Sequence, residues 1–169
     1  MHRPGPPTMG NVVGPAARLV AGVEGVNDHE NVGALFRNAA AFGVDAVVLD
    51  PTTADPLYRR SVRVSVGHVL SVPFAQGGDL AELSGHGFTT VALTPSASAE
   101  PLAAFAAAAP ERIALLLGAE GPGLSAATLA AADRTVRIPL APGVDSLNVA
   151  TAAAVAFSHL AGPTTTGRR

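Results

Sequence analysis

Residues 115–125 read LLLGAEGPGLS, and residues 137–148 read RIPLAPGVDSLN. In each stretch an apolar run passes into a glycine-containing turn, the first at Gly118 and the second at Gly143. This is typical of a buried strand that ends in a loop, where the missing Cβ lets the backbone approach a ligand closely. Open α/β sheets bind ligands outside the carboxyl ends of their strands, so the two ends predict one shared pocket beside Glu120.

Apolar runs alternate with helix-like segments along almost the whole chain around these turns. Strands are predicted at residues 18–24, 45–50, 69–74, 88–94, 113–117 and 135–140. Helices are predicted at residues 28–42, 80–83, 101–109, 125–132 and 147–160, with an arginine-rich turn or helix at 58–68. Strands and helices that alternate in this way form a parallel sheet covered by helices, so the sequence predicts an α/β fold.

Polar residues at three predicted helix starts suggest how those helices are capped. Asn27 and Glu30 have the spacing of a capping box at the 28–42 helix. Ser125 is the predicted N-cap of the next-to-last helix, and Ser146 has the position of an N-cap for the last one. A capping role for Ser146 is compatible with a role in a site.

The composition predicts one domain. A chain of 169 residues, 48% of them hydrophobic, can bury one core of small aliphatic side chains. We expect this domain to span residues 17–161. Residues 1–16 are rich in proline and glycine and are expected to be a disordered lead-in, and residues 162–169 are expected to be a flexible tail.

Several classes of function lack their residues in this sequence. There is no cysteine, and the five histidines have no metal-ligand spacing, so no metal site is expected. All eleven basic residues are arginines, which excludes lysine chemistry, and the net charge of −2 argues against general nucleic-acid binding by the whole chain. No apolar run spans a membrane and no secretory leader opens the chain, so a cytoplasmic protein is expected.

The glycines of residues 118–123 follow the order G-x-x-G-x-G, which is not the dinucleotide-binding order G-x-G-x-x-G. No acidic residue follows at the distance that would bind a ribose, so hydride transfer is not predicted. The chain also has no G-x-S-x-G sequence, which removes the usual serine hydrolase.

Three motifs in order resemble those of the SpoU (TrmH) branch of the SPOUT RNA methyltransferases. They are HENVGALFRNAAAFG at residues 29–43, LLLGAEGPGLS at 115–125 and RIPLAPGVDSLNVA at 137–150. The resemblance covers residues 20–160. It implies transfer of a methyl group from S-adenosylmethionine to a ribose 2′-hydroxyl of tRNA or rRNA. It also implies a homodimer and an α/β-knot fold with a carboxyl-terminal trefoil knot, which physical rules alone would not predict.

The resemblance assigns five polar residues to the surroundings of the reacting ribose: Asn31, Arg37, Glu120, Ser146 and Asn148. Taken singly, Asn31 could satisfy a backbone group in the first helical turn and Arg37 could be solvated. The family gives Arg37 the role of base. Because deprotonating a guanidinium near neutral pH is costly, we favour Arg37 as a clamp on the neighbouring phosphate, with the base role as the alternative.

The same resemblance implies that backbone groups and aliphatic walls hold the cofactor. The matching positions are Gly118, Ile138 and Leu147, with Thr94 and Leu140 as neighbours. Two positions depart mildly from the family, which often has asparagine at Ala119 and methionine at Leu140. Many members also carry an amino-terminal RNA-recognition domain where this chain has a proline-rich stretch, so the RNA substrate stays open.

RNA contacts are predicted at the densest basic group in the chain, which comprises Arg59, Arg60 and Arg63. Arginine suits phosphate because its planar fork donates two parallel hydrogen bonds. Two classes of function remain. One is an active RNA ribose methyltransferase, and the other is a non-catalytic knotted module that binds RNA or a partner. The presence of all five polar residues favours the enzyme.

Overall fold

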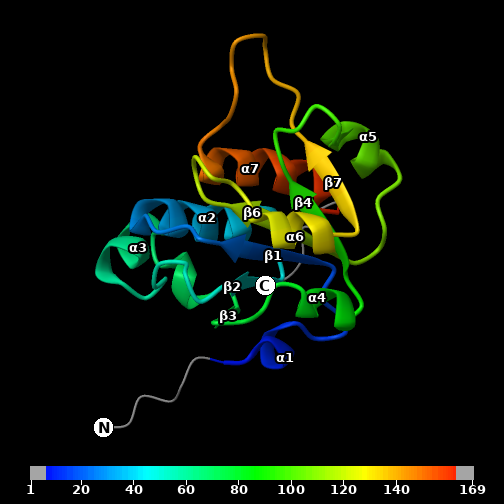
Figure 1. Cartoon of the computed structure of the whole chain (residues 1–169). Coiled ribbons are helices and arrows are strands. Elements are labelled where there is room, and N and C mark those ends of the chain that lie inside the picture. The colour runs from blue at the N-terminus through cyan, green and yellow to red at the C-terminus, as the bar shows by residue number, and fades with distance from the viewer. Residues whose placement is uncertain (1–6, 163–169) are drawn as a thin grey trace, which may run out of the picture.

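Seven parallel strands form one sheet in the computed structural model of the chain, which describes residues 7–162. They are β1 (Leu19–Glu24), β2 (Ala46–Leu49), β3 (Phe74–Gln76), β4 (Thr89–Leu93), β5 (Glu100–Pro101), β6 (Ile113–Gly118) and β7 (Arg134–Arg137). The strand order is β3-β2-β1-β6-β4-β7-β5, and every pair is parallel. The predicted α/β fold with a parallel sheet is therefore confirmed (Figure 1).

Helices cover both faces of this sheet. They are α1 (Met9–Val12), α2 (His29–Phe42), α3 (Arg59–Val64), α4 (Glu82–Gly85), α5 (Leu102–Ala107), α6 (Ala126–Ala131) and α7 (Val149–Leu160), with a 3₁₀ turn η1 (His68–Leu70). Helices α2, α5 and α7 bury side chains against one face, and α1, α4 and α6 pack on the other. The central strands β1 and β6 are consequently buried on both faces, as their nearly unbroken apolar sequences predict.

Helix α2 begins one residue later than a capping box at Asn27 would require. The N-cap is Asp28, whose carboxylate accepts from the backbone N–H of Glu30 at 2.7 Å. The Glu30 side chain forms an ion pair with Arg60. The predicted capping box is therefore wrong, because Asp28 supplies the cap and Arg60 takes the carboxylate. The helix ends as predicted at Gly43, which is left-handed with φ 70°.

Two predicted strands differ from the structure. Residues 69–74 do not form one strand. Val69 and Val72 are three positions apart and both buried, which suits the helical turn η1, and β3 begins only at Phe74, after Pro73. The last strand ends at Arg137 instead of residue 140, because Pro139 has no N–H to continue a ladder.

The lead-in is ordered where the structure describes it, which corrects the expectation of disorder. Residues 9–12 form helix α1, and Met9 and Val13 are buried in the second core. The guanidinium of Arg112 donates to the carbonyls of Gly14 and Ala17, fixing the segment against the sheet. Of the predicted disordered ends, residues 1–6 and 163–169 lie outside the described residues.

Candidate active site

Strand β6 ends in a tightly folded loop at the carboxyl edge of the sheet. Its last residue, Gly118, lies beside Glu24 of β1, and Ala119 and Gly123 then form an antiparallel bridge. A Cβ on Gly118 would lie 2.2 Å from the backbone nitrogen of Leu124, far inside contact distance. Only glycine therefore lets this loop fold back on its own strand.

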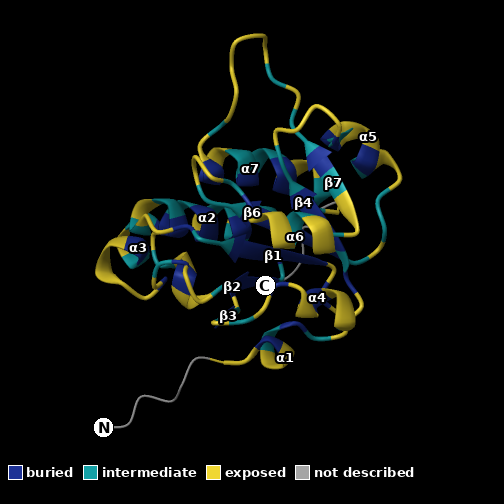
Figure 2. Ribbon diagram, viewed as in Figure 1, coloured by how far each residue is buried: buried dark blue, intermediate teal, exposed yellow. Residues whose placement is uncertain are grey.

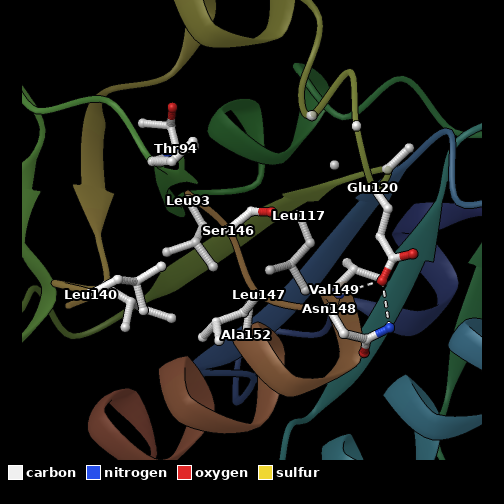
Figure 3. Close-up of a pocket in the computed structure, with 16 residues that line it drawn as sticks. Leu93, Thr94, Leu117, Glu120, Leu140, Ser146, Leu147, Asn148, Val149 and Ala152 are labelled. Carbon is white, nitrogen blue, oxygen red and sulfur yellow. Dashed lines mark hydrogen bonds between the residues drawn. The ribbon is translucent and has the colours of Figure 1, made fainter. Parts of the chain in front are cut away.

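A cavity of about 400 Å³ opens beside this loop (Figure 3). The lining residues are Leu93, Thr94, Pro95, Leu117, Gly118, Ala119, Glu120, Gly121, Gly123, Ile138, Leu140, Ser146, Leu147, Asn148, Val149 and Ala152. They come from the ends of β4 and β6, the start of α7 and the segment after β7. All five residues predicted to hold a cofactor are among them, and the two quoted stretches share one pocket as their glycines suggested.

The segment of residues 138–148 carries one wall of this cavity. It leaves the body of the molecule between β7 and α7 and returns through a turn at Gly143 (Figure 1). Most of it is exposed to solvent (Figure 2). Leu140 and Leu147, near its two ends, turn toward the cavity, so this exposed loop contributes apolar wall only at its base.

Three polar residues from the three motifs are joined by hydrogen bonds at the cavity. The side-chain amide of Asn148 donates to the Asn31 Oδ1 at 2.9 Å. It also donates to the carboxylate of Glu120 (Figure 3). Glu120 also accepts from the backbone N–H of Val149 at 3.3 Å. Asn148 is the N-cap of α7, because its Oδ1 accepts from the N–H groups of Ala150 and Thr151. The helix start thus fixes the orientation of its own site residue.

Ser146 lines the same cavity but does not cap the last helix. It lies two residues before Asn148, which takes that role, so the capping prediction for Ser146 is wrong. Among the described residues its hydroxyl forms no hydrogen bond. It is exposed and available to a ligand.

Arg37 does not reach this cavity within its own chain. It lies six residues after Asn31 on α2, or roughly 9 Å along the helix axis, and on a different side. Asn31 and Asn38 face α7, and Asn38 donates to the Ala150 carbonyl at 2.8 Å, whereas Arg37 is exposed. The structure thus brings four of the five predicted catalytic residues together and leaves Arg37 on the surface.

The arginines of α3 differ in their surroundings. The Glu30 carboxylate, by accepting a hydrogen bond and by its charge, raises the pKa of Arg60 above its ordinary value. Arg59 and Arg63 are exposed and have no ion-pair partner within residues 7–162. Two of the three predicted RNA contacts are therefore available for an anion, and Arg60 is committed to holding α3 against α2.

Sequence reasoning missed Glu24. Its carboxylate accepts from the backbone N–H of Ser125 at 2.6 Å and from the hydroxyl of Thr128. These bonds tie the end of β1 to the start of α6 and close the loop that follows Gly118. The sequence position of Glu24 could have indicated this role, because Glu24 comes after an apolar run, as Glu120 does. Ser125 is the N-cap of α6, as predicted.

Asp50 forms a second polar cluster at the same edge. Partial burial acts to raise the pKa of Asp50, but hydrogen bonds from the hydroxyls of Thr52 and Thr53 and from backbone amides, including Gly25, outweigh it and lower the pKa below its ordinary value. Thr52 and Thr53 belong to the turn that follows β2, and Gly25 follows β1, so the cluster joins the ends of these two strands.

Two absences apply to the described residues. Within residues 7–162 no group of three or more histidine, aspartate or glutamate side chains is placed to bind a metal ion. No helix in the same range is long and apolar enough to cross a membrane.

The family model of the SpoU rRNA methylases matches residues 18–158. The chain belongs to this family. It is 58% identical over 156 residues to an uncharacterised tRNA/rRNA methyltransferase of Mycobacterium tuberculosis, a match that covers 89% of this chain and 54% of that protein. It is 34% identical over 151 residues to the Bacillus subtilis 23S rRNA (guanosine(2553)-2′-O)-methyltransferase RlmP, covering 86% and 59%.

A solved structure supports the same fold. The AdoMet-bound rRNA methyltransferase of Sinorhizobium meliloti aligns with a TM-score of 0.78 and 26% identity, covering 86% of this chain and 57% of the other. The chain spans little more than half the length of these SpoU relatives.

Proposed function

We propose that the chain transfers a methyl group from S-adenosylmethionine to a ribose 2′-hydroxyl of tRNA or rRNA. The observation that carries this proposal is the hydrogen-bonded series of Asn31, Asn148 and Glu120 at the mouth of a cavity with a glycine wall. Its members come from three separate motifs, 117 positions apart at the extremes. A series of this kind orients polar groups toward a substrate in the cavity.

The cavity fits the cofactor in size and chemistry. Its volume of about 400 Å³ falls in the range of small-molecule sites. Leu93, Leu117 and Ile138 offer aliphatic walls for a flat base, and the loop after Gly118 offers backbone polar groups. The bound cofactor would supply an activated methyl group on a sulfonium and keep a neutral thioether. The remaining residues have to position a hydroxyl and accept its proton.

Glu120 is the only charged side chain among the lining residues. Its carboxylate is held through one oxygen by Asn148 and by the N–H of Val149. The other oxygen can accept the hydrogen bond of the ribose hydroxyl and, as the methyl group is transferred, its proton. We assign Glu120, Asn31 and Asn148 to orientation of the ribose, which can contribute several of the ~7–11 kcal/mol that positioning provides. Ser146 adds a hydroxyl on the opposite wall.

The phosphate beside the reacting ribose requires a cation that the lining residues do not contain. We propose a homodimer in which Arg37 of one copy completes the site of the other. The exposed position of Arg37 on α2, away from its own Asn31, supports this arrangement. In that role the guanidinium clamps the phosphate with two donors and lowers the cost of ionising the neighbouring hydroxyl.

RNA would approach over α3, where Arg59 and Arg63 are exposed. Contacts of this type hold the backbone in register and do not choose sequence. A cytoplasmic location, where tRNA and rRNA are available, completes the proposal, and the trefoil knot implied by the family resemblance stays a prediction.

The test is transfer of a labelled methyl group from S-adenosylmethionine by the purified full chain to RNA from cells that lack the gene. Digestion of the product should yield a 2′-O-methylated nucleoside, and Glu120→Gln should abolish the signal. Cofactor binding by calorimetry without methyl transfer to any RNA would instead support the non-catalytic module. Label on a base would overturn the ribose assignment.

A further inference from the structure

Tyr58 is the one exposed ring among the phenylalanines and the tyrosine of this chain. Of the six phenylalanines, four are buried and two are partly buried, and all lie within the described residues. Tyr58, the single tyrosine, is 54% exposed. Tyr58 therefore presents an aromatic surface to solvent in a chain with only 4% aromatic residues.

The ring of Tyr58 is held in place from behind. The imidazole of His29 lies against it, with ring centroids 4.2 Å apart and an angle of 36° between the planes. Tyr58 is also the N-cap residue of α3, but it caps through backbone geometry, and its side chain forms no cap hydrogen bond. The ring is therefore fixed on one side, open on the other, and not needed for the helix.

Two exposed arginines lie on the helix that begins after Tyr58. Arg59 follows directly, and Arg63 lies one turn further along α3. Both are exposed without an ion-pair partner in the described part of the chain. An aromatic ring with arginines beside it is the arrangement that holds unpaired nucleotides, since the ring stacks on a base and the guanidinium groups bind the phosphates.

Tyr58 and the candidate active site are connected through helix α2. His29, which supports the Tyr58 ring, is in the first turn of α2, two residues before Asn31. Helix α3 is fixed against α2 by the pair of Arg60 and Glu30 and by close packing at Gly33, where a Cβ would lie 2.6 Å from the Ser61 carbonyl. Figure 1 shows the two helices side by side. The ring of Tyr58 and the site residue Asn31 are therefore both positioned by helix α2.

We propose that Tyr58 is a stacking platform for an unpaired RNA base near the nucleotide whose ribose is methylated. This inference rests on the proposed function and adds a property of the substrate, since the target nucleotide would lie in a loop or single strand and not in a continuous helix. Arg59 and Arg63 hold the flanking backbone. A base in a continuous duplex cannot reach the ring, because both of its faces are already stacked.

The experiment uses the full chain and a single-stranded oligoribonucleotide that carries the fluorescent base 2-aminopurine. Wild type should quench the base on binding. Tyr58→Ala should remove the quenching and weaken binding by about 5- to 150-fold, the equivalent of ~1–3 kcal/mol for one base on an aromatic ring. Tyr58→Phe should restore both, because it keeps the ring and loses only the hydroxyl. The same sequence in a duplex should bind equally to wild type and Tyr58→Ala.

Leu70 provides the matched control, because it is 71% exposed on η1 and lacks a ring. Leu70→Ala should leave quenching and affinity unchanged. Equal losses in Leu70→Ala and Tyr58→Ala, or a loss that Tyr58→Phe does not restore, would overturn the stacking proposal. A shift from dimer to monomer in light scattering of Tyr58→Ala would assign this face to a second copy and also overturn it.

The stacking proposal can fail while the proposed methyl transfer holds. Methyl transfer by wild type together with unchanged binding by Tyr58→Ala would end the stacking proposal and leave the enzyme. Cofactor affinity and the midpoint of thermal unfolding should match in both variants, so a lower RNA affinity cannot reflect a damaged fold.

Discussion

Two polar networks lie at opposite edges of the sheet and differ in how completely they are satisfied. At the amino-terminal edge, Arg112 donates to the carbonyls of Gly14, Ala17 and His86 at distances of 2.8–3.1 Å, and its guanidinium lies 4.1 Å from the Phe88 ring centroid. At the carboxyl edge, the network centred on Glu120 faces a cavity of about 400 Å³.

The difference separates a structural role from a functional one. Each nitrogen of the Arg112 guanidinium donates to a backbone carbonyl, so this side chain is engaged in holding the chain together. The Glu120 network leaves one carboxylate oxygen and the Ser146 hydroxyl without partners among the described residues. Glu120 and Ser146 are exposed, so water solvates these open groups and a ligand can take the place of that water.

The largest expected effect is on catalysis in Glu120→Gln. The amide can still accept from Asn148 but has no charge, so methyl transfer should fall by about 10²- to 10⁴-fold. Stability should change little, because the exposed oxygen has no partner to lose. Initial rates with total RNA, and thermal unfolding of the same samples, measure both. A variant that unfolds early but transfers normally would place Glu120 with the structural network.

A mixing experiment tests the proposed contribution of Arg37 from the second copy. Arg37→Ala and Glu120→Ala should each be inactive alone. When equal amounts are co-folded, half of the dimers are mixed and each has one complete site, so activity should return to roughly a quarter of wild type.

No recovery on mixing, with dimers confirmed by light scattering, would mean that Arg37 and Glu120 must come from the same chain. The control is Arg37→Ala mixed with Asn148→Ala, which should recover equally because Asn148 and Glu120 share one cavity.

Much of this fold and site could be predicted from the sequence, for identifiable reasons. Strands β1, β2 and β6 are buried on both faces and are therefore apolar except for Glu24 at the end of β1, which makes them easy to predict. Gly118 and Glu120 follow such a strand directly. The cavity residues then follow from two strand ends that share one edge.

The parts that could not be predicted depend on contacts between distant segments. Residues 9–17 have a composition typical of a disordered lead-in, yet Arg112, 95 positions after Ala17, orders them. The cap of α7 was placed at Ser146 because both serine and asparagine suit that position, and only the path of the loop selects Asn148. The pair of Arg60 and Glu30 likewise requires knowledge of how α3 lies on α2.

Arg112→Lys should show the reverse of Glu120→Gln. Lysine keeps the charge but cannot reach three carbonyls with a planar fork, so the free energy of unfolding should fall by about 2–3 kcal/mol. At a temperature where the variant is folded, methyl transfer should match wild type. Denaturant unfolding and initial rates give the two numbers. Lost activity in folded protein would show that the amino-terminal edge is coupled to the site.

The smallest effect is expected when Asp50 is changed. This variant tests whether a polar group is functional merely because it lies at the carboxyl edge of the sheet. Asp50 lies at the same edge as Glu120, but its partners Thr52, Thr53 and Gly25 form a closed cluster. Asp50→Asn should leave methyl transfer unchanged and lower the free energy of unfolding by about 1–2 kcal/mol at neutral pH, because the donors lose a charged acceptor.

The pH dependence of this stability difference shows whether the Asp50 cluster acts through its charge. Hydrogen bonds hold the pKa of Asp50 in the folded chain below its ordinary value, so the carboxylate contributes stability above the pKa of the unfolded state. That contribution disappears as pH falls through the lower, folded value. Wild type and Asp50→Asn should therefore differ in stability at neutral pH and converge in the acid range.

Glu82→Gln makes the same charge change at an exposed side chain without hydrogen bonds in the described chain and should show no such convergence. A constant difference at every pH would mean that the Asp50 cluster acts through shape and not through charge.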